Sequence, residues 1–262
     1  MQNVGLIGYG AIACYVATHL RAQGASLTVL ARPGREDAAR AAVSDALIVT
    51  DVAQMLARTN LVVDCAGHAG LGAHGADILR QGTHLITLSL GALADTALYA
   101  ELESAAQSGN GRLHLASGAI GALDALGAAA VGGLEMVRYT GRKPPLGWAG
   151  SPAEKALDLA TLTQATPHFT GCARDAALLY PKNANVAAAV ALAGIGFDKT
   201  EVQLIADPTA TGNTHRVEAR GAFGSLDFTI TGAALPDNPK SSALAAMSAV
   251  RAVQNAQNWL RM

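Results

Sequence analysis

A glycine-rich turn near the start of the chain limits the possible folds more than any other feature. Residues 3–7 form a short apolar run, and the pattern Gly8-x-Gly10-x-x-Ala13 follows, leading into apolar residues at helical spacing. In a dinucleotide-binding unit the first glycine permits a tight turn, the second leaves room for a pyrophosphate, and a small third residue lets helix and strand pack closely. The pattern therefore predicts a strand, a phosphate-binding turn and a helix. The alternative is a tight turn in an α/β protein that binds no nucleotide.

The residues beside this turn indicate how a cofactor would be held. Ala11 and Ile12 begin the predicted helix, so their N–H groups would face the phosphates. The acidic residue expected about 20 positions further on, which would bind the adenosine ribose, is missing. Arg32 follows the second predicted strand instead, with Arg35 close by, and an arginine there suits a 2′-phosphate. We therefore expect NAD or NADP as the cofactor, with NADP accepted. The alternative is that both arginines are solvated loop side chains.

The first 117 residues alternate between apolar strands and helices, which predicts a parallel sheet of the Rossmann type. Two strands are expected to end in small residues, at Ala66 and Gly67 and again at residues 89–92. Ligands bind at the carboxyl edge of such a sheet, so we expect Ala66 and Gly67 to contact the cofactor. His68 would touch the cofactor or the substrate, or lie in a surface loop.

The pattern changes after Ser117, where we place a domain boundary. We expect a dinucleotide-binding domain over residues 1–117, to which a closing helix at 241–262 returns, and a substrate and dimerisation domain over 118–240. The second domain is predicted to be α+β, built on a mixed or antiparallel sheet, because its late strands alternate between apolar and polar residues. Its expected elements are a long helix after residues 118–121, a strand at 135–140, a Pro/Gly loop at 141–150, helices at 153–162 and 183–193, and antiparallel strands from 200 with a hairpin at 221–224.

Composition excludes several other classes of function. The net charge is −1 and no basic run is present, so the chain lacks the phosphate-neutralising patch of a nucleic-acid-binding protein. The longest apolar stretch, residues 186–197, is too short to cross a bilayer, and the N-terminus does not resemble a signal peptide. Three cysteines without close spacing predict neither a disulfide framework nor a zinc site. We therefore expect a cytoplasmic protein with no metal and no membrane partner.

Several longer strings in the second half closely resemble the L-aspartate dehydrogenase family. The resemblance covers nearly the whole chain in order. The strings are residues 117–124 (SGAIGALD), 139–144 (YTGRKP), 180–188 (YPKNANVAA), 207–208 (DP), 213–215 (NTH), 221–224 (GAFG) and 238–243 (NPKSSA).

This resemblance implies the oxidative deamination of L-aspartate to iminoaspartate with NAD or NADP, by a homodimer. The imine then hydrolyses to oxaloacetate and ammonia or enters nicotinamide cofactor biosynthesis. In the family, the histidine that matches His215 is the active-site residue, and the positions that match Ala119 and Asn185 contact the cofactor. The chain departs from the family pattern at Ala13, where glycine is more usual, which puts the helix packing and the affinity for the cofactor in doubt.

The chemistry of the reaction points to the same residues. The substrate amine must be neutral before a hydride can leave Cα, and histidine has an ordinary pKa suited to take up that proton. The two substrate carboxylates need cationic or N–H partners. Lys182, at the start of a predicted helix, is the preferred cation, and Lys240, before the closing helix, is another candidate. The weaker candidates are Arg174, Arg142 and Lys143. For each of them, and for His215 on spacing alone, the alternative is a solvated surface position.

Two other classes of protein remain as alternatives. One is another two-domain reductase, of the dihydrodipicolinate reductase or homoserine dehydrogenase type, although the paired histidines of the former are missing here. The other is a module that senses NAD(P) without turnover, because Rossmann folds also serve in regulators. Such a sensor would have no use for His215.

Overall fold

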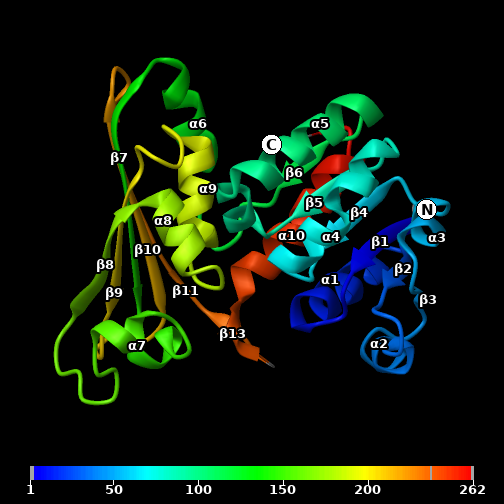
Figure 1. The fold of residues 1–262 in the computed structure, drawn as a ribbon, viewed down its shortest axis with the longest axis horizontal. Helices are drawn as coiled ribbons and strands as arrows, with labels where there is room; N and C mark the ends of the chain where they lie inside the picture. Colours follow the sequence, from blue (N-terminus) through cyan, green and yellow to red (C-terminus); the bar gives the residue numbers. More distant parts are fainter. Residues whose placement is uncertain (1–2, 237, 261–262) are drawn as a thin grey trace. The chain divides into compact units, whose positions relative to one another are not determined.

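The computed structural model describes residues 3–236 and 238–260 of the chain (Figure 1). The chain divides into two compact units. Unit 1 comprises residues 1–116 and 245–262, and unit 2 comprises residues 117–244. The domains expected from the sequence were 1–117 with 241–262, and 118–240.

Unit 1 is built on a six-stranded parallel sheet in the order β3-β2-β1-β4-β5-β6. Ile7, at the end of β1, pairs with Leu30 on one side and with Asp64 on the other, so three strands end at one level. The order reverses between β1 and β4, and this is the point where open α/β sheets bind ligands. The strands are β1 (Asn3–Ile7), β2 (Ser26–Leu30), β3 (Leu47–Val49), β4 (Leu61–Asp64), β5 (His84–Thr87) and β6 (Leu113–Leu115).

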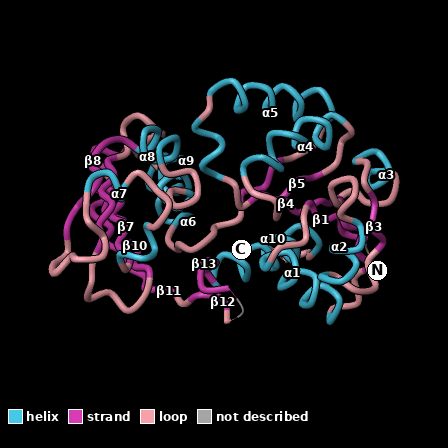
Figure 2. Tube along the Cα trace, turned by 60° about the horizontal axis from the view of Figure 1, so that its bottom comes forward, coloured by secondary structure: helices cyan, strands magenta, loops and turns pink. Residues whose placement is uncertain are grey.

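Helices cover both faces of this sheet, with α4 and α5 on one face and α1 and α10 on the other (Figure 2). The strand side chains Leu6, Val29 and Val63 are fully buried, as expected for a sheet covered on both faces. Ala249 and Val253 of the last helix join the same core, which explains why the chain end returns to unit 1. The helices are α1 (Ala11–Ala22), α2 (Glu36–Ala42), α3 (Val52–Leu56), α4 (His68–Arg80), α5 (Thr96–Gly109) and α10 (Ala243–Gln257), with a 3₁₀ turn at Leu90–Ala94.

Unit 2 is built on a five-stranded mixed sheet in the order β11-β10-β7-β9-β8. β7 and β9 are parallel, and the other neighbouring pairs are antiparallel. The strands are β7 (Leu134–Lys143), β8 (Thr166–Cys172), β9 (Glu201–Ala206), β10 (Asn213–Gly221) and β11 (Gly224–Gly232), followed by the short pair β12 (Ala234–Leu235) and β13 (Asn238–Ser242).

One face of this mixed sheet is covered by α6, α8 and α9 (Figure 1). Their bounds are Leu123–Val131, Ala173–Leu179 and Asn185–Ala193, and the shorter α7 (Ala153–Ala156) follows a 3₁₀ turn at Pro145–Trp148. The opposite face carries ion pairs between exposed side chains, such as Arg138 with Glu201 and Arg216 with Asp227. The sheet therefore has one buried face and one polar face, as the alternating sequence pattern predicts.

The fold class expected from the sequence is confirmed, but several elements of unit 2 differ from the prediction. The strand expected at 135–140 continues through Gly141 to Lys143, where a loop was expected. Glycine and lysine hid the alternation there, because neither marks a buried strand position. The helix expected at 153–162 is limited to α7, strand β8 was not anticipated, and β9 is parallel to β7 instead of antiparallel.

Differences in unit 1 are smaller. The small residues expected to end a strand at 89–92 begin two residues after the last residue of β5, Thr87. Among the described residues, no helix is long and apolar enough to span a bilayer.

Candidate active site

The predicted phosphate-binding turn in unit 1 has the geometry that a dinucleotide requires. Gly8 has φ +89°, and a Cβ atom there would lie 3.2 Å from the Cβ of Ala66. A Cβ on Gly10 would meet no heavy atom within 4 Å, so the space in front of the helix is open. Ala13 is fully buried against the sheet, which accounts for a small residue at the third position of the motif. No described side chain caps α1, so the N–H groups at Ala11 and Ile12 face this space as backbone donors.

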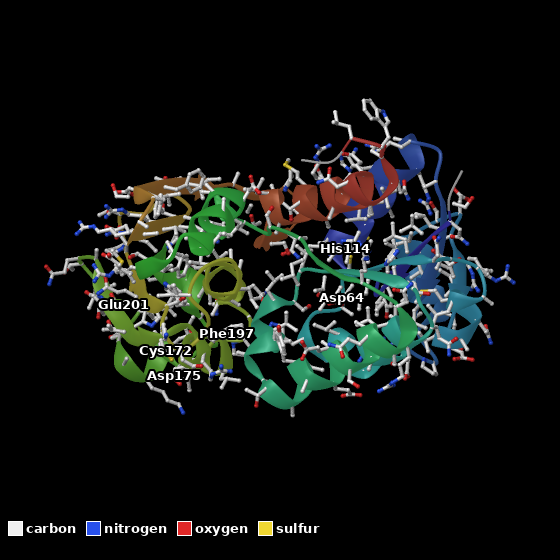
Figure 3. The ribbon with its side chains drawn as sticks, turned by 90° about the horizontal axis from the view of Figure 1, so that it is seen from above. Asp64, His114, Cys172, Asp175, Phe197 and Glu201 are labelled. Atoms are coloured by element: carbon white, nitrogen blue, oxygen red, sulfur yellow. The ribbon has the colours of Figure 1, made fainter. Side chains whose placement is uncertain are left out.

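A buried carboxylate joins the two loops next to this turn. Asp64, at the end of β4 and labelled in Figure 3, accepts hydrogen bonds from Ala66 N (2.9 Å), Thr87 Oγ1 (2.9 Å) and Ser89 Oγ (2.6 Å). Burial raises the pKa of Asp64, and these donors act in the opposite direction. Asp64 therefore fixes Ala66 and Gly67 after β4 relative to the loop after β5.

Arg32 lies two residues after the end of β2, with an exposed side chain. It forms no ion pair within the part of the chain that the structure describes. Arg32 therefore remains available to an anionic group at this edge of the sheet. Its interpretation as a solvated loop residue stays open.

In unit 2, the predicted catalytic histidine lies on the buried face of the mixed sheet. His215, on β10, is 3% exposed, and Tyr139, on β7, is 1% exposed. The Tyr139 hydroxyl lies 2.7 Å from Nδ1 of His215, and the two rings are nearly parallel with centroids 6.0 Å apart. This hydrogen bond occupies Nδ1, so Nε2 is the ring nitrogen left for a ligand.

A buried lysine lies on the same face. Lys143, the last residue of β7, is 8% exposed, and its Nζ donates a hydrogen bond to Oδ1 of Asn183 at 2.9 Å. The ammonium also lies 4.8 Å from the ring centroid of Trp148, within the range of a cation–π contact. Burial lowers the pKa of Lys143 to about 8.

The ammonium of Lys143 changes the properties of two histidines. Burial, and then the charge of Lys143, lowers the pKa of His215 to about 4. The same two causes lower the pKa of His168 to about 4. The sequence argument used the ordinary pKa of histidine, whereas the structure keeps both imidazoles neutral at physiological pH.

Sequence reasoning did not identify His168. It lies at an irregular point of β8, packs edge-on against Trp148 with ring centroids 4.4 Å apart, and contacts the Tyr180 hydroxyl through Nδ1 at 3.2 Å. Its Nε2 is buried without a hydrogen-bond partner among the described residues. The sequence signal for it was weak, because β8 contains proline and glycine and was not recognised as a strand.

The other predicted residues lie in different surroundings. Lys182, preferred as the substrate cation, is exposed, whereas its neighbour Asn183 contacts Lys143. Ala119 is buried in the turn before α6, and Asn185 is the first residue of α9. The side chain of Lys240 lies outside the described residues.

The two candidate arginines have acidic partners. Arg142 bonds Asp207 at 2.8 Å and lowers the pKa of that carboxyl, while Arg174 bonds Asp198 at 2.6 Å. Asp207 N also donates to the Lys143 carbonyl, which ties the turn before β10 to the end of β7. Both arginines are therefore already engaged in ion pairs.

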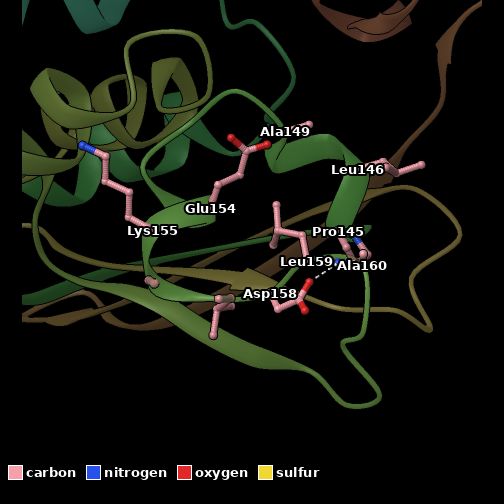
Figure 4. A pocket seen from close by; sticks show the side chains of 10 residues that line it. Pro145, Leu146, Ala149, Glu154, Lys155, Asp158, Leu159 and Ala160 are labelled. Atoms are coloured by element: carbon pink, nitrogen blue, oxygen red, sulfur yellow. Dashed lines mark hydrogen bonds between the residues drawn. The ribbon is translucent and has the colours of Figure 1, made fainter.

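A surface hollow elsewhere in unit 2 has no such chemistry. It lies between the 3₁₀ turn at Pro145–Trp148 and the segment after α7, where Asp158 accepts a hydrogen bond from Ala160 N (Figure 4). Neither His215 nor Lys143 is among its lining residues. The described residues also contain no group of three or more His, Cys, Asp or Glu side chains arranged to hold a metal.

Comparison with known families matches the two parts of the chain separately. Residues 8–116 match the NAD-binding domain described for homoserine dehydrogenase, and residues 124–256 match the C-terminal domain of aspartate dehydrogenase. A curated L-aspartate dehydrogenase from Ruegeria pomeroyi is 58% identical over 96% of this chain and 91% of its own length. The chain belongs to the L-aspartate dehydrogenase family.

Further relatives support this family assignment. An L-aspartate dehydrogenase from Cupriavidus taiwanensis is 49% identical over 97% of both chains. The crystal structure of aspartate dehydrogenase from Thermotoga maritima is similar with a TM-score of 0.79 and 26% identity, covering 100% of this chain and 99% of that one. A hyperthermophilic archaeal homoserine dehydrogenase shares the fold alone, at a TM-score of 0.58 and 11% identity.

These matches confirm the predicted family, an oxidoreductase that uses NAD or NADP. They therefore disfavour both the other reductases and the non-catalytic sensor. The roles of single residues are not decided by these matches.

The lowered pKa values predict how stability depends on pH. The pKa of His215 is about 4 in the folded protein and about 6.5 when unfolded, so between these values the unfolded chain binds more protons. The free energy of unfolding should therefore fall as pH drops from about 6.5 to 4, by up to about 1.4 kcal/mol per pH unit for this histidine. Urea denaturation at several pH values measures this slope.

His215→Gln should make the slope shallower, whereas His74→Gln, on α4 of unit 1, is the control. An unchanged slope in His215→Gln would show that the imidazole is already protonated in this range.

Proposed function

We propose that the chain oxidises L-aspartate to iminoaspartate with NAD or NADP, and that His215 is its catalytic base. The observation that supports this most strongly is the group of buried polar side chains on one face of the unit 2 sheet. His215 is held there by Tyr139, and burial and then the nearby ammonium of Lys143 lower its pKa. Pairing a neutral base with one cation suits a substrate that is an ammonium and a dicarboxylate at once.

The residues present fit a nicotinamide dinucleotide. The positive φ of Gly8 and the open space at Gly10 form the turn that the pyrophosphate needs. When bound, the cofactor accepts a hydride from Cα of the substrate. The proposed contacts are Gly8, Gly10, Ala11, Ile12, Arg32, Ala66 and Gly67 in unit 1, together with Ala119 and Asn185 in unit 2, the last two from the family resemblance.

The protein's own residues would handle the proton. The substrate amine must lose its proton before its lone pair can form the C=N bond, and Nε2 of His215 is positioned to accept that proton because Nδ1 is occupied by Tyr139. The two substrate carboxylates bring negative charge, which favours the protonated imidazole once substrate is bound. Iminoaspartate then hydrolyses to oxaloacetate and ammonia or is used in nicotinamide cofactor biosynthesis.

Lys143 would bind one substrate carboxylate. Its ammonium is buried and has one amide oxygen and one indole face as partners, so an anion would replace part of its lost hydration. The sequence argument assigned this role to Lys182, and we keep Lys182 as the alternative that the experiment below separates.

We also infer a homodimer in the cytoplasm. The dimer rests on the family resemblance. The cytoplasmic location is supported by the three cysteines, all of which are free.

The central test is replacement of His215. His215→Ala should lower kcat for L-aspartate by about 100-fold or more, the range expected for loss of a general base, while the Kd for the cofactor stays within twofold. Reduced-cofactor absorbance measures turnover, cofactor fluorescence measures binding, and His74→Ala is the matched control. Wild-type turnover in His215→Ala would refute the proposed base, and a wild-type chain that binds cofactor but oxidises no amino acid would refute the activity.

Replacement of the two lysines separates the assignments for the substrate cation. Lys143→Met should raise KM for L-aspartate by about 30-fold or more, because a charge-assisted bond in a buried site is lost. In the wild type, KM should rise above about pH 8, where Lys143 loses its proton, and this rise should disappear in Lys143→Met. Lys155→Met, at an exposed lysine, is the control. A raised KM in Lys182→Met with an unchanged KM in Lys143→Met would restore the original assignment.

Arg32 decides which cofactor is accepted. Arg32→Ala should lower kcat/KM for NADP by about tenfold or more and leave kcat/KM for NAD within threefold, because a 2′-phosphate loses its charged partner. Arg40→Ala, on the neighbouring helix α2, is the control. An unchanged kcat/KM for NADP in Arg32→Ala would place Arg32 in the solvent and not at a 2′-phosphate.

A further inference from the structure

We infer that Tyr139 is the positioning residue for His215, and that Gly141 is required because any other side chain would block their contact. This inference rests on the proposed role of His215 as the base. It concerns which nitrogen of the imidazole faces the substrate and what holds the other nitrogen.

The sheet register explains why the contact exists. Gly141 of β7 lies directly opposite His215 of β10, whereas Tyr139 lies opposite Val217, two residues further along. Residues two apart on a strand share a face, so all four positions lie on the buried side of the sheet. To reach His215, the Tyr139 ring must therefore extend along its own strand, across Gly141.

Because residue 141 has no side chain, there is room for the Tyr139 ring to extend across it to His215. A Cβ atom on Gly141 would lie 2.7 Å from the Tyr139 hydroxyl oxygen, 3.1 Å from Cζ and 3.2 Å from Cε1. The first distance is too short for two non-bonded atoms, so the phenol would have to move. Gly141 does not have a positive φ. Glycine is therefore required here because there is no room for a side chain, and not because of an unusual backbone conformation.

A tyrosine suits this position because its hydroxyl is neutral and can both donate and accept. Burial raises the pKa of Tyr139, so the phenol keeps its proton. When Nδ1–H donates to the phenol oxygen, Nε2 carries a lone pair and can accept a proton from the substrate. The protonated imidazole keeps the same Nδ1–H donation, so the contact supports His215 before and after proton transfer.

Few charged groups act on this pair. Lys143, on β7, lowers the pKa of His215, whereas β11 places the apolar Ile230 opposite it. Tyr139 adds no charge of its own. Its influence on the reaction must therefore come from the direction of the hydrogen bond and from stabilising the imidazolium.

Tyr139→Phe tests the inference through kinetics. We expect kcat for L-aspartate to fall 10- to 100-fold and KM to stay within threefold. In a plot of kcat against pH, the fall in kcat on the acidic side (the acid limb) should move to lower pH by half a unit or more. The reason is that the imidazolium of His215 loses the acceptor for Nδ1–H, which lowers the pKa of His215. A merely structural role would not move this limb. Tyr99→Phe, at an exposed tyrosine of α5, is the control.

Gly141→Ala should produce the same effects while leaving the chemical groups of Tyr139 and His215 unchanged. Its added methyl group displaces the phenol, so kcat and the acid limb should change as they do in Tyr139→Phe. Gly127→Ala is the matched control, because the Cβ there would have its nearest neighbour at 3.9 Å. Thermal unfolding checks that each variant is folded. If Gly141→Ala does not fold, the kinetics of Tyr139→Phe alone test the inference.

Nitrogen-15 NMR of the ring supplies a readout that does not need turnover. At pH 8, wild-type His215 should carry its proton on Nδ1, and Tyr139→Phe should shift the population toward the Nε2–H tautomer. The inference is overturned if the wild type carries its proton on Nε2. It is also overturned if Tyr139→Phe keeps wild-type kcat and acid limb while His215→Ala is inactive. Failure of the proposed function looks different, because His215→Ala would then retain full activity.

Discussion

The buried ammonium of Lys143 determines the electrostatics of unit 2. Removing a charge from water is costly, and the structure offsets that cost incompletely, with one amide oxygen from Asn183 and the face of Trp148. Burial, and then the remaining positive field of Lys143, lowers the pKa of His215 and of His168, so both imidazoles stay neutral. A site with one cation and two neutral rings gains most from an anionic ligand, which restores the solvation that burial removed.

The partner of His215 follows from the same constraint. In many hydrolases a carboxylate holds the catalytic histidine and stabilises its cationic form. A second buried charge beside Lys143 would pair with the ammonium and compete with the substrate carboxylate. A phenol orients the ring without that competition, at the cost of a weaker base in the free enzyme. In the proposed mechanism, the substrate's own carboxylates provide the negative charge that His215 needs in order to accept a proton.

Sequence reasoning succeeded where a short motif and a regular pattern coincide. In unit 1 the strand, the turn at Gly8 and Gly10, and the helix were predicted, and the structure has each of them. In unit 2 His215 came from the family resemblance, because the spacing alone favoured a solvated histidine. Lys143 was ranked low because the strand was expected to end at residue 140, which left Gly141 and Lys143 in a loop. Burial and cross-strand neighbours depend on register, which a single strand does not reveal.

The two family matches fall on different units of the chain. Unit 1 matches a domain described for homoserine dehydrogenase, so its turn and the loops tied by Asp64 are a general device for a nicotinamide dinucleotide. Unit 2 matches the aspartate dehydrogenase domain, and it contains the buried lysine and histidine. A hydride acceptor can serve many substrates, whereas the arrangement of charge around the substrate decides which carbon gives up its hydride. In the proposed mechanism, the choice of an amino dicarboxylate then depends on the buried face of the mixed sheet, and within it on which side chains carry charge.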